Sequence, residues 1–217
     1  MINREVFWHS LLFTVFVFLS GLFLGFLVEN SRVNNVESAL YNSEINLLDQ
    51  QIRDGVLGSF KVSCPVAKKE LFAFADSIYD EAFKLEEYDA ASKFSDALPI
   101  LHKRYDLLRV LLWTESREFN SKCPDSFHTV VYFYEYGSDD SSVKGIQSFY
   151  SRMLTELKEK HEDNVLLIPL AANLNVSSLN VLLDSYKIDN IPAILIDEKV
   201  LITQPPTFEE LEQYIAE

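Results

Sequence analysis

The chain has 217 residues and a formal net charge of −14, with acidic residues spread along its length. Binding to nucleic acid or to an anionic lipid surface needs clustered Lys and Arg, so we expect neither kind of partner. The length suits one domain with additional segments, and the acidity mainly favours solubility.

The first long segment is apolar and begins almost at the N-terminus. Residues 6–28 contain no formally charged side chain. As a helix they would extend about 34 Å, enough to cross a hydrocarbon core of about 30 Å. A cleaved signal peptide is the alternative, but its apolar part is usually shorter and ends in small residues. We therefore expect residues 1–29 to be a transmembrane signal anchor that contacts lipid through residues 6–28.

The orientation of this anchor follows from weaker signals. Arg4 precedes the segment and Arg32 follows it, so the positive-inside rule gives only a slight bias. The acidic remainder and the two cysteines favour a single-pass protein with its N-terminus inside and its C-terminal part outside the cytoplasm. Gly21 and Gly25 match the small-xxx-small pattern of close helix pairs. Such pairs are common by chance, so a homodimer and a monomer both stay open.

Helical patterns occupy the middle of the chain. Residues 30–62 predict a stalk helix, because apolar positions between Val33 and Val56 follow a helical period. Its apolar edge would pack on its own domain or on a second copy. Residues 63–126 predict a helical hairpin, with one helix over about 66–93 and another from Ser95 that fades near Asn120.

The chain has two cysteines. Cys64 lies at the start of this hairpin segment in sequence, and Cys123 lies near its end. They are too far apart for a Cys-x-x-Cys pair, and the histidines lack ligand spacing, so we expect no metal site and no cofactor. In an extracytoplasmic domain a structural disulfide is the natural interpretation. Two free buried thiols, or a bond to a partner protein, are the alternatives.

Residues 127–217 alternate between strand and helix patterns, which predicts an α/β domain with helices flanking a sheet. Pro169 places the second strand near an edge or bends it. Tyr132, Tyr134 and Tyr136 alternate on the first strand, so they should share one face, most simply the core. Asn or Ser should cap the helix expected over 176–186, and Thr207 the helix expected over 208–216. The strands are expected over 129–135, 164–171, 193–196 and 200–203, and the helices over 141–161, 176–186 and 208–216.

The passage Tyr186 to Asp197 reads YKIDNIPAILID, with Ile191-Pro192 directly before a strand. This passage, and the order of elements over 127–217, resemble the thioredoxin-like superfamily. The resemblance implies a β-α-β-α-β-β-α domain that follows the helical segment and the transmembrane helix. It also implies a cis bond before Pro192, which would face the start of the 141–161 helix.

The resemblance breaks where the family carries Cys-x-x-Cys. Here the matching positions are Ser138, Asp139, Asp140 and Ser141, and a serine hydroxyl does not exchange with a disulfide. The resemblance therefore implies a redox-inactive member that binds or holds polypeptides, with Ile191 and Pro192 as candidate peptide-binding residues. Capping of the following helix by Ser or Asp is the simpler explanation of the segment.

Three functions fit these patterns. The first is a membrane-anchored, extracytoplasmic binding or scaffold protein; the second is a thiol-disulfide oxidoreductase that uses Cys64 and Cys123; the third is an accessory subunit of a membrane protein complex. The sequence lacks a nucleophile–base constellation and a Gly-rich phosphate loop, which favours the non-enzymatic functions. Asn175-Val-Ser177 matches the N-glycosylation acceptor pattern. The pattern is meaningful only if this domain lies outside a cell that glycosylates proteins.

Overall fold

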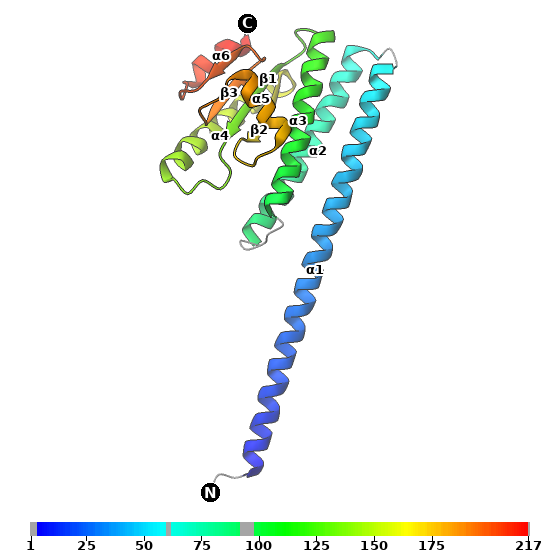
Figure 1. Cartoon of the computed structure of the whole chain (residues 1–217), viewed down its shortest axis with the longest axis vertical. Coiled ribbons are helices and arrows are strands. Elements are labelled where there is room, and N and C mark those ends of the chain that lie inside the picture. The colour runs from blue at the N-terminus through cyan, green and yellow to red at the C-terminus, as the bar shows by residue number, and fades with distance from the viewer. Residues whose placement is uncertain (1–3, 60–61, 92–97, 217) are drawn as a thin grey trace. The chain divides into compact units, whose positions relative to one another are not determined.

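The computed structural model describes residues 4–59, 62–91 and 98–216 (Figure 1). The chain divides into two compact units, Met1–Gln51 and Ile52–Glu217. The four segments expected from the sequence (1–29, 30–62, 63–126 and 127–217) stay a prediction, since the unit boundary falls inside the first helix.

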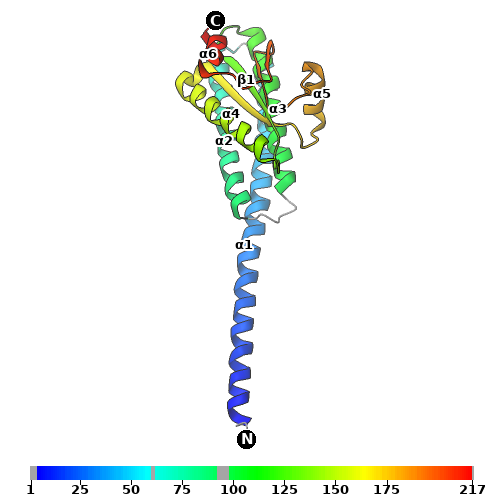
Figure 2. The ribbon, with the colours of Figure 1, turned by 90° about the vertical axis from the view of Figure 1, so that its left-hand side faces the viewer.

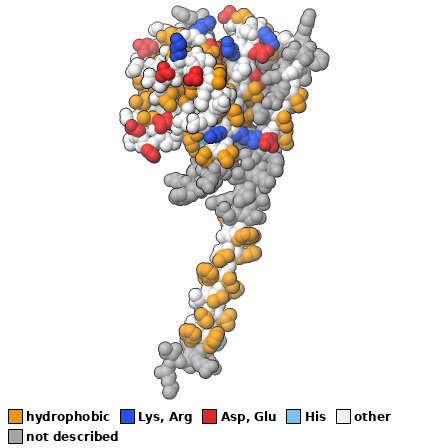
Figure 3. Space-filling view, viewed as in Figure 1, with side chains coloured by type: hydrophobic (Ala, Val, Ile, Leu, Met, Phe, Trp, Pro, Cys, Tyr) orange, Lys and Arg blue, Asp and Glu red, His pale blue; other side chains and the backbone are white. Residues whose placement is uncertain are grey.

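Helix α1 (Arg4–Ser59) is continuous through the expected anchor and stalk. The first proline of the chain is Pro65, so no residue before it removes a helical hydrogen bond by lacking an N–H. Within α1, Phe7–Val28 has a mean hydropathy of 2.6 and none of it is buried. Hydrophobic side chains line the visible face of this segment (Figure 3). It is one N-terminal helix long and apolar enough to cross a membrane, a property that signal sequences share.

Helices α2 (Cys64–Ala91) and α3 (Leu98–Lys122) form the expected hairpin and pack against each other. Pro65 and Pro99 each stand at the second residue of a helix, where a missing N–H costs little. The α2 face that meets α3 carries Phe74, Ala75 and Ile78, each at most 4% exposed. α3 continues to Lys122, beyond the point where its apolar pattern fades.

The C-terminal part is a mixed α/β fold around a four-stranded sheet of order β2-β1-β3-β4. β1 pairs with β2 in parallel, while the β1–β3 and β3–β4 pairs are antiparallel. β2 is thus an edge strand, which confirms the expectation from Pro169. The strands are β1 (His128–Tyr134), β2 (Val165–Ala171), β3 (Ala193–Ile196) and β4 (Val200–Ile202), and the helices are α4 (Ser141–His161), α5 (Ser177–Tyr186) and α6 (Phe208–Ala216), with a 3-10 turn at Glu162–Asn164.

Alternation along the strands divides the core into two faces. Val130 and Tyr132 point to the face with α4 and α6, where they join an apolar cluster. Phe133 points to the other face, where its ring lies 5.9 Å from that of Trp113 of α3. Figure 2 shows α4 and α5 on opposite sides of β1. Both faces of the sheet are therefore covered by helices.

Local capping accounts for two helix starts and corrects a third. Thr207 and Glu210 form a reciprocal capping box at α6, with N···O distances of 2.8 and 3.2 Å, which confirms the predicted Thr207 cap. The Asn or Ser cap expected for α5 is wrong. Its N-cap is Val176, without a side-chain cap bond. Val176 is instead buried, so packing fixes the start of that helix.

Candidate functional site

The degenerate redox segment predicted from the sequence lies between β1 and α4. Ser138, Asp139 and Asp140 are in the loop, and Ser141 is the first residue of the helix. Ser138 is buried with 6% exposure, while the other three side chains are exposed. Asp140 caps the helix, since its Oδ1 accepts a hydrogen bond from the N–H of Ser142 at 2.7 Å. Capping by Asp140 is thereby confirmed.

Ile191 and Pro192 lie at the same end of the sheet as this loop. Ala193 pairs with Phe133 in the antiparallel β1–β3 ladder, so Pro192 stands just beyond the carboxyl end of β1. The Ile191–Pro192 peptide bond is cis, as expected, and both side chains are half-buried. The fold thus brings the two segments singled out in the sequence to one end of one strand.

Two side-chain amides fix the start of the loop. Gln147 of α4 accepts from the N–H of Glu135 at 2.6 Å and donates to its carbonyl at 3.1 Å. Asn173, which follows β2, accepts from the N–H of Tyr136 at 2.9 Å and donates to its carbonyl at 2.8 Å. These amides satisfy backbone groups that have left the strand ladder. The loop is therefore attached to α4 and to the β2–α5 connection.

The three tyrosines near this end do not share one environment. Tyr132 and Tyr134 stack with a centroid distance of 5.8 Å and pack against the α4-face cluster, while Tyr134 also hydrogen-bonds Arg109 of α3. Tyr136 follows the end of β1, and its ring lies 3.8 Å from that of His102 of α3. The expectation of one shared face is wrong for Tyr136, because the strand alternation stops at Tyr134.

A buried polar cluster on α3 adjoins the carboxyl end of β2. Arg109 donates to the Tyr105 hydroxyl at 2.6 Å and lies 3.7 Å from the centroid of that ring. Its Nη1 is 3.5 Å from Asp106 Oδ1, which also accepts from the N–H of Ala171 at 3.4 Å. Asp106 is 1% exposed, and its Oδ2 has no hydrogen-bond partner in the described part of the chain. An ion pair is therefore buried between α3 and β2.

The electrostatics of this cluster follow from its burial. Burial raises the pKa of Asp106 to about 6, and the Arg109 charge offsets only part of that effect. Burial also raises the pKa of Tyr105 to about 12. Burial by itself lowers the pKa of Arg109, but Tyr105, Tyr134 and Asp106 outweigh it and raise that pKa. Arg109 is thus charged at every physiological pH, whereas mild acid neutralises its partner.

The outer edge of β2 is closed by side chains rather than by another strand. The carbonyl of Leu167 accepts from the Tyr79 hydroxyl of α2, and the carbonyl of Val165 accepts from Lys158 at 3.0 Å. Further along the same strand, Pro169 has no N–H to satisfy, and the N–H of Ala171 donates to Asp106. These alternate positions would otherwise offer free backbone groups to another strand.

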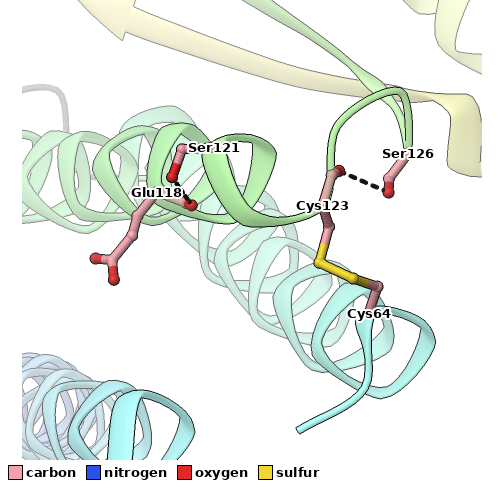
Figure 4. The surroundings of a disulfide bond; sticks show 5 residues. All are labelled: Cys64, Glu118, Ser121, Cys123 and Ser126. Atoms are coloured by element: carbon pink, nitrogen blue, oxygen red, sulfur yellow. Dashed lines mark hydrogen bonds between the residues drawn. A yellow bond between two sulfur atoms is a disulfide. The ribbon is translucent and has the colours of Figure 1, made fainter. Parts of the chain in front are cut away.

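The sulfur atoms of Cys64 and Cys123 are 2.02 Å apart, which is disulfide-bond distance (Figure 4). Cys64 begins α2, and Cys123 directly follows α3 and precedes β1. The pair therefore joins the open end of the hairpin, as expected. The whole of β1, seven residues and roughly 20 Å of strand, lies between Cys123 and the Ser138–Ser141 segment.

The geometry of the described residues limits the chemistry available. Ser138 makes no hydrogen bond to a His, Asp or Glu side chain among them, so it has no adjacent base. No group of three His, Cys, Asp or Glu side chains in the described part of the chain is placed to hold a metal ion. The cavity beside Tyr79, Tyr105 and Arg109 has a volume of about 10 Å³, far below that of a ligand pocket.

The sequence patterns did not single out the buried cluster as a candidate site. Its signal was present, because Tyr105, Asp106 and Arg109 stand at helical spacing among the apolar positions of the same helix. All three are buried. The role of Tyr79 had no such signal, since its partner carbonyl lies 88 residues away.

Comparison with protein-family models and with curated proteins finds no match for this sequence.

Proposed function

We propose that the chain is a single-pass membrane protein whose extracytoplasmic part is a redox-inactive, thioredoxin-like binding or scaffold module. One observation carries the proposal: the loop after β1 and the Ile191–Pro192 segment lie at one end of the sheet, and no cysteine is near them. In the resembled family this end faces polypeptide substrates. The strand order, with a parallel β1–β2 pair and an antiparallel β3, supports the same assignment.

The placement of the cysteines argues against the oxidoreductase alternative. Both are paired with each other at the opposite end of β1, so neither can act at the Pro192 end of the sheet. They join α2 to the end of α3, which is the place of a structural brace. Labile disulfides are the catalytic ones, whereas braces resist reduction.

The polypeptide-binding hypothesis rests on backbone groups at the Pro192 end. The residue before a proline at a strand entry has backbone groups that an extended peptide can pair with as an added strand. Ile191 adds a half-buried apolar side chain beside them. The expected partner is therefore an extended, unfolded polypeptide segment, and membrane anchoring through residues 6–28 would hold it near the bilayer.

Binding of an unfolded polypeptide to the full chain in mild detergent tests the proposal. The probe is reduced, carboxymethylated lactalbumin with a fluorescent label, and binding is followed by anisotropy. Pro192→Ala should weaken binding at least tenfold while shifting the unfolding temperature little. Leu201→Ala, at an exposed residue of the edge strand β4, is the matched control and should leave binding unchanged.

A parallel insulin-reduction assay separates the alternatives. We expect no turnover from the wild-type chain. Turnover that disappears in a Cys64→Ser, Cys123→Ser variant would establish the oxidoreductase instead. Absence of polypeptide binding, or equal loss in Pro192→Ala and Leu201→Ala, would reject the binding module and leave Pro192 with a structural role.

A further inference from the structure

We propose that Asn175 is an N-glycosylation acceptor, and that its co-substrate is a polyprenyl-phosphate-linked oligosaccharide. The inference rests on the proposed function, in which the part of the chain that follows the membrane segment lies outside the cytoplasm. Asn175-Val176-Ser177 is the one Asn-x-Ser/Thr triplet in the whole sequence. A triplet alone is weak evidence, so the structural setting of its three residues carries the argument.

The triplet lies in the connection between β2 and α5 and alternates in exposure. Asn175 and Ser177 are exposed, while Val176 between them is 6% exposed and serves as the N-cap of α5. Asn175 has a φ of 53°, a left-handed turn conformation that Asn tolerates better than most residues. Val176 thus anchors the triplet to the body, and the two residues that a glycosyltransferase reads stand in solvent.

The acceptor groups are also uncommitted. Within the described part of the chain, the side chains of Asn175 and Ser177 make no hydrogen bond. Asn173, two residues earlier, is the contrast, because both atoms of its amide bind the backbone of Tyr136. A glycan on Asn173 would break the loop that it holds, whereas one on Asn175 displaces no contact.

The reaction balances with that donor. The amide nitrogen of Asn175 forms a bond to the anomeric carbon of the glycan, and the bond from that carbon to the donor phosphate oxygen breaks. The amide loses one proton, and the polyprenyl phosphate leaves with the electron pair. The Ser177 hydroxyl is the recognition element of the acceptor, so Ser177→Ala should abolish modification and Ser177→Thr should retain it.

Translation of the full chain with endoplasmic-reticulum microsomes tests the inference. Wild type should migrate as one slower band that an endoglycosidase returns to the unmodified position. Asn175→Gln and Ser177→Ala should each remove that band completely. Mass spectrometry of the peptide that contains residue 175 should locate the glycan.

A relocated acceptor separates failure of this inference from failure of the proposed orientation. Lys187→Asn with Asp189→Ser, in an Asn175→Gln background, places a triplet on another exposed–buried–exposed segment whose first residue has a φ of 55°. Modification there without modification of the wild type would overturn the Asn175 site and keep the orientation. Modification of neither would overturn the outward orientation, and with it the acceptor.

Discussion

Both faces of the sheet are packed by apolar side chains, but they differ in their buried polar groups. On the α4–α6 face, Tyr150, Leu154 and Leu157 are at most 1% exposed and pack with strand residues in an apolar cluster. On the α3 face, a buried ion pair reaches the end of β2, and α2 adds a hydroxyl to its edge. Apolar packing is non-directional and tolerates substitution by volume, whereas a buried charge requires its partner. The α3 face should therefore respond to single polar changes and to pH.

The largest effect is expected from removing the cation of the pair. Arg109→Met should lower the free energy of unfolding by about 3–5 kcal/mol at pH 7, because it leaves Asp106 buried without its counter-charge. Urea unfolding of the full chain in mild detergent measures it, with Trp113 fluorescence in a Trp8→Phe background. Arg117→Met, exposed on the same helix, is the control, with an expected change below about 0.5 kcal/mol. Equal losses of stability in Arg109→Met and Arg117→Met would show that the α3 face does not depend on the buried ion pair.

The cross-link of the α2–α3 hairpin should give the next largest effect. A Cys64→Ser, Cys123→Ser variant should lose about 2–4 kcal/mol, since an unfolded chain without that loop closure has more entropy. The same unfolding assay applies. Thiol labelling before and after reduction checks the premise, and full labelling of the unreduced protein would contradict it.

The buried carboxyl of Asp106 gives the α3 face a pH dependence of its own. The folded-state pKa of Asp106 is raised from 3.8 to about 6, so the folded chain binds its proton more tightly than the unfolded chain. The resulting stabilisation is present below about pH 4 and is lost as the pH rises through 6, a change of roughly 2–3 kcal/mol.

Comparison of wild type with Asp106→Asn between pH 4 and 7 isolates this contribution from other carboxyl groups. The wild type should lose stability relative to Asp106→Asn as the pH rises from 4 to 7, because asparagine does not titrate. Asp139→Asn, on an exposed residue of the 135–140 loop, should show no such variation. A flat difference for Asp106→Asn would mean that the carboxyl is solvated.

The smallest effect concerns the sheet edge. Tyr79→Phe should cost about 1–2 kcal/mol, because the carbonyl of Leu167 loses its hydrogen-bond donor. Tyr214→Phe, at an exposed residue of α6, should cost almost nothing in the same assay. The Tyr79→Phe variant should also aggregate faster on mild heating, because the backbone at the outer edge of β2 is then free to pair with strands of other molecules. Unchanged stability and aggregation would show that α2 covers the edge sterically.

Much of the fold could be predicted from local patterns. Helical periods marked α2 to α6, alternation marked β1, and Pro169 indicated an edge strand before any pairing was known. The capping box at Thr207 and the cap at Asp140 were also readable, because a cap involves residues only two or three positions apart. The α5 cap failed as a prediction because Val176 is fixed by burial, which a local pattern does not encode.

By itself, the sequence determined the apolar N-terminal helix, the order of helices and strands, the absence of cysteine from positions 138–141 and the one Asn-x-Ser triplet at Asn175. These depend on composition and on neighbours along the chain. Tertiary structure alone decided that Asp106 and Arg109 are buried against Ala171, that Tyr79 closes the edge of β2, and that Ser138 and Pro192 share one end of the sheet. The physical reason is that burial and hydrogen-bond partners join residues far apart in the chain, so a pattern within one helix gives the direction of a side chain but not what it meets.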